Sequence, residues 1–380
     1  MPRVAVIGWA QSRHRVRNPD LAPAELVYET VAAALAHARV GVEDIDVVIG
    51  AGDDVLDGRS ISNVFVAESE GAYLKEETKV EEDGAFAAAY AWMRIAAGAG
   101  RTALVVAYGM PSQAEAGAYS ALQADPFYQR PLGIDAEVAA ALAADAYASA
   151  AGLLPREAAR VAIRDLAAAF FNPHAVRGGH LDIEEILEAD RVAGDLGVYD
   201  LPATADGCCA VVLASEEFAR EHGTRSILIR GLGWATDAYY LGHRDLARLE
   251  SARLAAGRAY EMAGVREPAA AFDLAELSPA STYHELMLLE ALGFAPEGKA
   301  AAWEGRTRLN PSGGPLGADP VMATGLVRIA EAATQLAGEG GDRQVKGQRP
   351  RTALAHGACG LAMQSNVVFC LEAGDGAGAR

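Results

Sequence analysis

The feature that most constrains the fold is a polar loop, a helix of small residues and a buried strand that follow one another between residues 80 and 107. Residues 81–83 are acidic, residues 84–98 are rich in Gly and Ala, and residues 103–107 are apolar. In α/β enzymes this order places a side chain at a helix N-terminus, where free backbone N–H groups favour negative charge. Gly84 stands at the junction. It is either a vacated nucleophile position or a glycine that caps an ordinary core helix.

Alternating strand and helix patterns indicate the fold class. In the first half, the largely apolar segments 4–8, 44–50 and 103–107 predict strands, and an amphipathic helix starts near Pro23. This βαβ order is typical of a parallel sheet covered by helices, so we predict an α/β fold. The second half repeats the order, with strands at residues 226–231, 270–277 and 366–371 and helices at residues 246–263, 282–292 and 320–336. We therefore expect two similar βαβαβ lobes, residues 1–225 and 226–380.

Two segments interrupt this order. Residues 53–78 are acidic and lack periodicity, which predicts an irregular connection over an active site or a dimer interface. Between about residues 109 and 196, a loop is followed by helices at residues 136–151 and 155–171 with no strand between them. This predicts a helical loop domain within the first lobe. It either covers a ligand or forms a cap without a ligand role.

Composition and charge exclude several classes of function. The chain has 380 residues, of which 51% are hydrophobic and 22% are charged, as in folded globular proteins. Its formal net charge of -18 argues against nucleic acid or an anionic membrane surface as a partner. An anionic substrate would need a local cluster of Arg or Lys, and the cationic residues are scattered along the sequence.

Cysteine usage and apolar segments bear on the compartment. The four cysteines, at positions 208, 209, 359 and 370, form neither a disulfide framework nor a zinc pattern. We therefore expect a reducing, cytoplasmic location and no metal site. The first residues lead directly into an apolar run, so no signal peptide is expected. No apolar run of about 18 residues escapes interruption, so no membrane span is expected either.

Five short motifs resemble those of one enzyme family. They are residues 172–175 (Asn-Pro-His-Ala), 206–213 (starting Asp-Gly), 310–314 (Asn-Pro-Ser-Gly-Gly), 318–325 (ending Ala-Thr-Gly) and 356–360 (His-Gly-Ala-Cys-Gly). In this order and spacing they resemble the thiolase superfamily, most closely the sterol-carrier-type thiolases and the lipid-transfer-protein thiolase homologues. The resemblance covers nearly the whole chain. It implies the thiolase fold: two similar βαβαβ lobes in five layers, with a helical loop domain that covers the coenzyme A (CoA) site.

The resemblance also assigns roles to two positions at the expected site. In the family, the first catalytic cysteine opens the central helix, where this chain has Gly84. No acyl-enzyme can form there, unless Gly84 results from an engineered Cys-to-Gly change. The family histidine before the Ala-Thr-Gly loop is replaced by Asp319. This carboxylate is either a catalytic base or the N-cap of a helix that starts at Pro320.

The segment 278–286 aligns with the family segment that carries His-Asp-x-Phe, whose His and Phe are absent here. Glu285 matches the family glutamate on the following helix, and we expect it to act as a general base or to order water, rather than to be a solvated helix residue. Either His356 or Cys359 is expected to supply acid/base chemistry. Cys208 and Cys209 are expected in the core. Predicted substrate-binding residues are Phe86, Tyr283, His284, Asn310, Gly313, Gly314 and Gly360.

Three functions are compatible with these residues. The resemblance implies an acyltransferase that makes or breaks a C–C bond of a CoA thioester, by 3-oxoacyl-CoA thiolysis or condensation. Lipid-transfer-protein homologues that lack the first cysteine imply a CoA-ester retro-aldolase instead. A third possibility is a catalytically silent subunit that binds acyl-CoA. The resemblance further implies a homodimer across the central helices, a small OB-fold zinc-ribbon protein as a second partner, and no covalently bound cofactor.

Overall fold

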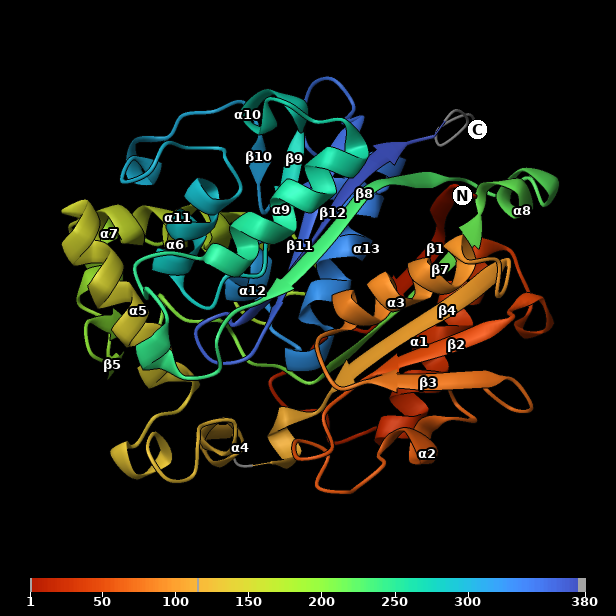
Figure 1. Cartoon of the computed structure of the whole chain (residues 1–380), viewed down its shortest axis with the longest axis horizontal. Helices are drawn as coiled ribbons and strands as arrows, with labels where there is room; N and C mark the ends of the chain where they lie inside the picture. The colour runs from red at the N-terminus through yellow and green to blue at the C-terminus, as the bar shows by residue number, and fades with distance from the viewer. Residues whose placement is uncertain (1, 115, 375–380) are drawn as a thin grey trace.

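The computed structural model describes residues 2–114 and 116–374, and its centre is a mixed ten-stranded sheet (Figure 1). Across the sheet the strands are β10 (Arg308–Leu309), β9 (Leu274–Glu276), β11 (Thr352–Cys359), β12 (Ser365–Ala373), β8 (Ile227–Thr236), β1 (Val4–Gln11), β7 (Gly207–Ser215), β4 (Thr102–Gly109), β2 (Val47–Ala51) and β3 (Glu76–Val80).

The two halves of the sheet have the same topology. In the first half β3, β2 and β4 are parallel, and β7 and then β1 continue antiparallel. In the second half β10, β9 and β11 are parallel, and β12 and then β8 continue antiparallel. The halves meet where Ala5 and Val6 of β1 pair with Leu228 and Ile227 of β8. The expectation of two similar lobes is therefore confirmed, whereas a boundary at residue 225 stays a prediction.

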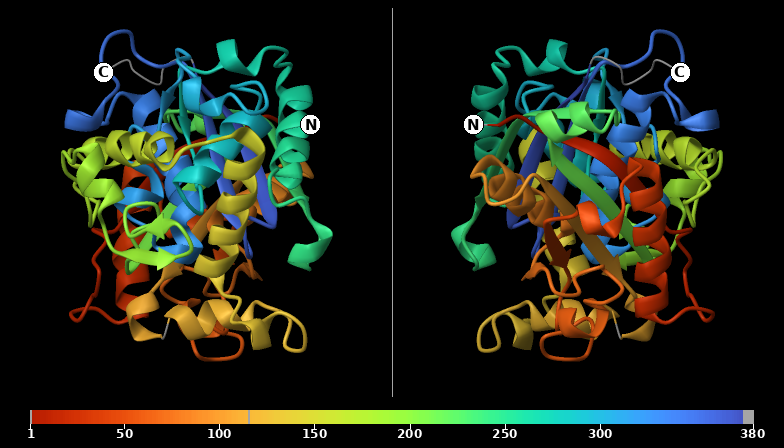
Figure 2. Two further views of the ribbon diagram at one scale, coloured as in Figure 1. Left: turned by 90° about the vertical axis from the view of Figure 1, so that its left-hand side faces the viewer. Right: turned by 90° about the vertical axis from the view of Figure 1, so that its right-hand side faces the viewer.

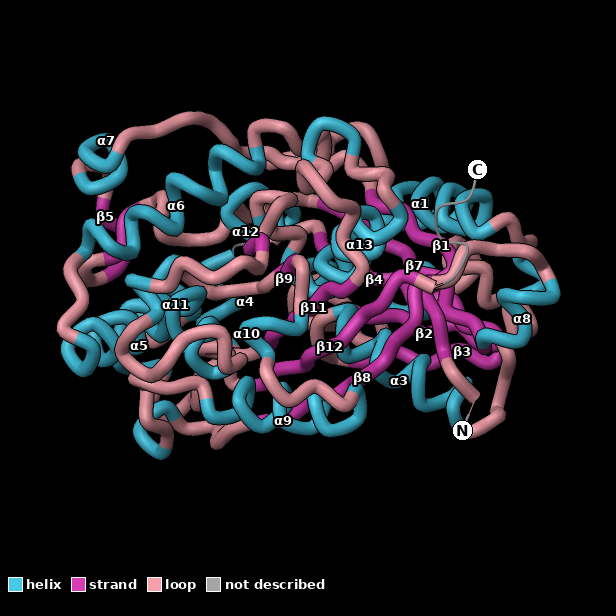
Figure 3. Tube along the Cα trace, turned by 90° about the horizontal axis from the view of Figure 1, so that it is seen from above, coloured by secondary structure: helices cyan, strands magenta, loops and turns pink. Residues whose placement is uncertain are grey.

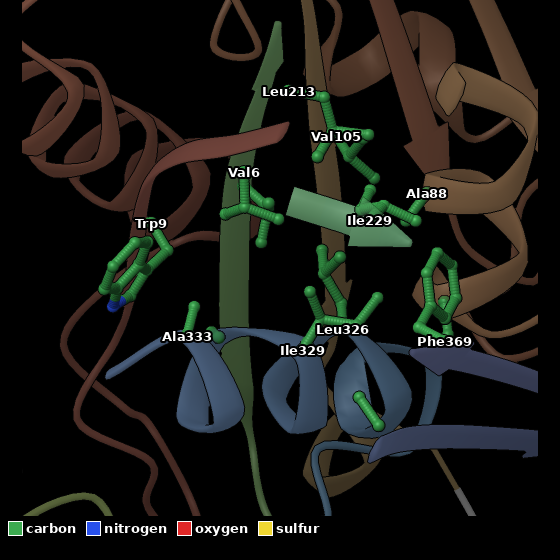
Figure 4. Close-up of a cluster of buried hydrophobic side chains, with 14 of the residues drawn as sticks. Val6, Trp9, Ala88, Val105, Leu213, Ile229, Leu326, Ile329, Ala333 and Phe369 are labelled. Atoms are coloured by element: carbon green, nitrogen blue, oxygen red, sulfur yellow. The ribbon is translucent and has the colours of Figure 1, made fainter. Parts of the chain in front are cut away.

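Helices divide the molecule into five layers. The central layer contains α3 (Gly84–Ala96) and α13 (Thr324–Ala337), which share one core with the inner faces of both half-sheets. Figure 4 shows part of this core, with Leu326 and Ile329 of α13 near Val105 and Ile229. On the outer faces, α1 (Pro23–Ala38) covers the first half-sheet and α9 (Glu250–Ala263) covers the second. Seen from above, the strands run through the middle between these helices (Figure 3).

The helical insertion lies between β4 and β7. It contains α4 (Ala116–Leu122), α5 (Ala136–Ala151), α6 (Pro155–Ala169), α7 (Ile183–Leu187) and a hairpin of β5 (Arg191–Ala193) and β6 (Leu196–Gly197). Its helices α5 and α6 pack on α11 (Thr282–Ala291) of the second half. They stand at one end of the molecule (Figure 2). The predicted helices at residues 136–151 and 155–171 are thus confirmed, the second being two residues shorter than expected.

Some elements differ from expectation. The segment 53–78 contains α2 (Asn63–Val66) and the start of β3, whose charged residues hide the strand pattern because β3 is at the sheet edge. The segment 270–277 begins as α10 (Pro268–Ala271) and only then forms β9. Strand β11 was not predicted, because its small residues give no alternation. The remaining short helices are α8 (Glu216–Glu221) and α12 (Gly314–Gly317).

No single helix among the described residues is long and apolar enough to cross a membrane, although the bent pair of α5 and α6 passes the same test by length and composition.

Candidate active site

A cavity of about 290 Å³ lies where the two central helices begin. Its lining includes side chains from both halves of the chain and from the insertion. Among the lining residues whose side chains can donate or accept a proton are Asp83, Tyr119, Ser278, Asp319 and Cys359. Of the predicted catalytic residues, Asp319 and Cys359 therefore share one cavity, as does the predicted substrate-binding Gly360.

Asp319 is half-buried at the cavity wall. Its backbone is held by an N–H bond to Ala203 O (2.7 Å), and its carboxylate accepts a hydrogen bond from the Thr324 hydroxyl. Burial raises the pKa of this carboxyl above its usual value. Asp319 does not cap a helix at Pro320, because a 3₁₀ turn follows and α13 begins only at Thr324. Within that turn, Val321 adopts a φ of 44°, a strained conformation for a β-branched residue.

Asp83 is a site residue that sequence reasoning missed. It is the N-cap of α3 and only 3% exposed. One carboxylate oxygen accepts from the N–H of Ala85 (2.8 Å) and the other from the N–H of Gly325 (2.7 Å). Burial raises its pKa to about 7, and the nearby charge of Asp319 adds to the shift. The sequence could have indicated Asp83 by its position: an Asp directly before a helix of small residues is a common N-cap pattern.

Gly84 is fully packed and does not leave an open nucleophile position. A Cβ atom on Gly84 would lie 2.6 Å from the Cβ of Ala107 and 2.8 Å from the Cβ of Leu326. Real Cβ atoms do not approach this closely, so a cysteine here requires the core to shift. A vacated nucleophile position at residue 84 therefore does not agree with the packing. The structure favours the other interpretation, in which Gly84 belongs to an ordinary core helix and its lack of a side chain lets α3 lie close to β4 and α13.

Cys359 is the last residue of β11 and is half-buried in the cavity wall. Burial, together with the charges of Asp83 and Glu82, raises the pKa of its thiol to about 12. The thiol is therefore neutral near pH 7 and can donate a proton or a hydrogen bond, whereas a nucleophilic thiolate is disfavoured. Nearby, the Tyr119 hydroxyl donates to Asp53 Oδ2 (3.0 Å), and burial raises its pKa.

Glu285 lies outside the cavity lining. It is fully buried on α11, where it forms an ion pair with Arg164 and accepts a hydrogen bond from Asn310 Nδ2 (2.8 Å). Glu285 is thus not a solvated helix residue, and its role as a general base or water-ordering group stays a prediction, because it does not line this cavity. These contacts join α11 to α6 and to the loop that holds Asn310, so they stabilise the packing of these three segments.

The two predicted histidines are neutral and buried. His356 accepts from the N–H of Ser278 at Nδ1 (3.3 Å), and its Nε2 lies 2.9 Å from Asn366 Oδ1. His284 Nδ1 lies 2.8 Å from Ser281 Oγ. Burial lowers the pKa of each to about 4. Neither ring is part of the cavity lining, so neither is placed to exchange protons with a ligand there.

The other predicted binding residues are spread over the second half and the core. Tyr283 lines a separate cavity of about 520 Å³ beside α5 and the β5–β6 hairpin. Phe86 belongs to the central core, and Cys208 and Cys209 are fully buried as expected. Asn310, Gly313 and Gly314 form a tight loop in which all three have positive φ, and a Cβ on Gly313 would lie 2.4 Å from the Cβ of Ala169. This loop packs against α6 and does not line the cavity.

The charges around the cavity are mostly negative. Asp83, Glu137 and Asp319 are in the lining, and the described lining residues include no Lys or Arg. The buried guanidinium of Arg328 offsets part of this negative charge. It pairs with Glu276 (2.9 Å) and lowers the pKa values of Asp83 and Asp319. Within the described part of the chain, no group of three or more His, Cys, Asp or Glu residues is arranged to hold a metal ion.

Sequence comparisons relate this chain to thiolases. The family model "Thiolase C-terminal domain-like" matches residues 233–372. Sterol carrier protein 2 of Oryctolagus cuniculus is 33% identical over 200 residues, which are 49% of this chain and 36% of that protein. This chain therefore spans well under half the length of that curated relative. An acetyl-CoA acetyltransferase of Methanocaldococcus jannaschii is 26% identical over 375 residues, 91% of this chain and 93% of that protein.

Solved structures show the same fold over 98% of the chain. The structure titled "Ltp2-ChsH2(DUF35) aldolase" matches with a TM-score of 0.83 and 21% identity, covering 98% of each chain. Human mitochondrial 3-ketoacyl-CoA thiolase matches with a TM-score of 0.75 and 15% identity, covering 98% of this chain and 99% of that chain. Residues 233–372 thus match the thiolase C-terminal domain-like model, and the chain has the thiolase fold, which agrees with the resemblance carried by its motifs.

Proposed function

We propose that this protein makes or breaks a C–C bond of a CoA thioester by acid–base chemistry, without an acyl-enzyme at residue 84. The observation that carries this proposal is that Asp319 and Cys359 line one cavity while Gly84 beside it has no room for a side chain. The matched relatives and structures include both acetyl-CoA acetyltransferases and an aldolase, and the site favours the aldolase type of reaction.

The reaction that fits these groups is the retro-aldol cleavage of a 3-hydroxyacyl-CoA. Asp319 takes the proton of the 3-hydroxyl group, the bond between C2 and C3 breaks, and C3 leaves as an aldehyde or ketone. The electron pair of the broken bond passes to the thioester as an enolate, whose negative charge is favoured by the N-terminal ends of α3 and α13. Cys359 then gives its proton to C2, and the proton on Asp319 returns to the thiolate, so that the step is redox-neutral.

Thiolytic acyl transfer is the second candidate, because acetyl-CoA acetyltransferases are among the relatives. It would require Cys359 to act as a nucleophilic thiolate. The pKa of about 12 opposes this at neutral pH. Acyl transfer is therefore the less favoured route for this site.

We propose two partners. The first is a second copy of the chain, supported by the free edge of β3 and by exposed apolar residues next to it: Ile61, Val64, Phe65, Tyr73 and Leu74. The second is a small OB-fold zinc-ribbon protein, supported by the structural match to an aldolase whose title names a second, DUF35 component. A cytoplasmic location and a CoA-covering role of the helical insertion belong to the same proposal.

Incubation with 3-hydroxyacyl-CoA and 3-oxoacyl-CoA thioesters tests the function. The expected result is release of a shorter acyl-CoA and a carbonyl compound from the 3-hydroxyacyl-CoA. CoA-dependent cleavage of 3-oxoacyl-CoA alone would favour acyl transfer. Binding of both thioesters without turnover, also after addition of a zinc-ribbon partner, would indicate a silent subunit and overturn the proposal.

A further inference from the structure

Ser278 has a buried hydroxyl group that no other described residue contacts by a hydrogen bond. It lies between β9 and α11, is 7% exposed, and belongs to the lining of the cavity that holds Asp319 and Cys359. Its Oγ has no hydrogen-bond partner among the described residues. An unpaired buried hydroxyl costs folding free energy, so a ligand oxygen that pairs with it would recover this cost on binding.

A chain of buried hydrogen bonds holds the backbone of Ser278 in place. Its N–H donates to Nδ1 of His356 (3.3 Å), which leaves the Nε2 proton for Asn366 Oδ1 (2.9 Å). Asn366 Nδ2 in turn donates to Ser251 Oγ (2.8 Å) and to Met363 O (2.8 Å). His356 is neutral, because burial lowers its pKa to about 4. These hydrogen bonds account for the buried polar groups of His356 and Asn366, which fix the loop that carries Ser278 in the cavity lining.

The charge of the lining limits what can pair with this hydroxyl. The cavity contains the carboxyl groups of Asp83, Glu137 and Asp319, and no Lys or Arg is in its described lining. An acyl group that carries its own carboxylate would face these acids without a counter-charge. The group that enters is therefore uncharged, and its partner for Ser278 is a neutral hydroxyl or carbonyl oxygen.

We infer that Ser278 is a specificity-determining residue that binds a neutral oxygen of the substrate's acyl group. His356 and Asn366 are positioning residues that act through the Ser278 backbone. The inference rests on the proposed function, since it takes the acyl part of a CoA thioester as the ligand of this cavity.

The test compares the binding of two thioesters that differ by one oxygen. Dissociation constants of 3-hydroxybutyryl-CoA and butyryl-CoA are measured by calorimetry for the wild type, for Ser278→Ala and for Ser226→Ala. Ser226 is a matched control, because its buried Oγ also lacks a partner in the described part of the chain but is outside the cavity lining. We expect Ser278→Ala to weaken 3-hydroxybutyryl-CoA binding about 3- to 10-fold, the range for one hydrogen bond, and to leave butyryl-CoA unchanged. Ser226→Ala should bind both like the wild type.

Thermal unfolding gives a second readout. Removing an unpaired hydroxyl should leave the midpoint of Ser278→Ala equal to or above that of the wild type. A clear fall in the midpoint would show a structural role and overturn the inference. Equal effects of Ser278→Ala on both thioesters, or none, would overturn it while leaving the proposed function intact. If the wild type binds neither thioester, the proposed function fails as well.

Discussion

The carboxylate of Asp83 accepts a hydrogen bond from the backbone N–H of Gly325, which is 242 positions away in the sequence (2.7 Å). Because its other oxygen caps the first turn of α3, one side chain joins the starts of the two central helices, one from each half of the fold. This bond brings the positive ends of both helices to the same cavity wall. The site is thus assembled at the contact between two repeats.

The raised pKa of Asp83 predicts a pH dependence of stability. Its value is about 7 in the folded state and near 3.8 when unfolded, so the folded state binds more protons between these values. Stability due to this group is then highest below about pH 4 and falls as the pH rises to about 7. We expect the unfolding free energy of the wild type, minus that of Asp83→Asn, to decrease by more than about 1 kcal/mol between pH 4.5 and 7.5.

Urea unfolding at both pH values measures this difference. Glu304→Gln, which removes an exposed carboxylate, serves as the control and should follow the wild-type profile. A constant difference between the wild type and Asp83→Asn would show that Asp83 does not titrate in this range.

The packing of Gly84 predicts that Gly84→Cys destabilises the protein. Its Cβ would overlap with Ala107 and Leu326, and overpacking of this kind costs about 1–3 kcal/mol. The matched control is Gly257→Ala in α9, where a Cβ meets no atom within 4 Å. That change should stabilise by roughly 0.5–1 kcal/mol, because Ala favours the helix over Gly. If Gly84→Cys is as stable as the wild type and gains thiolysis of 3-oxoacyl-CoA, residue 84 is a nucleophile position after all.

The buried contacts of Glu285 predict a structural phenotype. Glu285→Gln breaks the ion pair with Arg164, and we expect a loss of about 1–3 kcal/mol in unfolding free energy, since Arg164 is partly exposed. Glu250→Gln, which breaks an exposed pair with Arg253, should leave stability nearly unchanged. Unaltered stability of Glu285→Gln together with a loss of turnover would instead support the catalytic role that the sequence suggested.

Asp319→Asn tests the general base. The amide keeps the size of the side chain but cannot accept the substrate proton, so we expect kcat to fall about 10²–10⁴-fold with little change in the Kd of a CoA thioester. Steady-state kinetics and calorimetry measure the two effects. A fall in affinity with unchanged kcat would make Asp319 a binding residue only.

The fold was largely accessible from the sequence, because buried strands such as residues 103–107 and helices such as residues 136–151 have clear periodicity. Strands β3 and β11 could not be predicted from the sequence. Strand β3 lies at the sheet edge and carries charged residues, and β11 consists largely of small residues. Motif order pointed to Asp319 and Cys359, which line the cavity, and their catalytic roles stay predictions. The ion pair of Glu285 was not predicted, because its partner Arg164 is 121 positions away and no local sequence pattern indicates that pair. Asp83 and Ser278 could not be identified as cavity residues either, since their place depends on how the two halves meet.

The most direct test of the central claim is a rapid-quench experiment with a 3-hydroxyacyl-CoA, analysed by intact-protein mass spectrometry and by chromatography of the products. Acid–base cleavage predicts a shorter acyl-CoA and a carbonyl product in equal amounts, with no added mass on the protein at any time point. A transient acyl adduct on Cys359 that forms and decays at the rate of turnover would contradict the account and establish covalent acyl transfer.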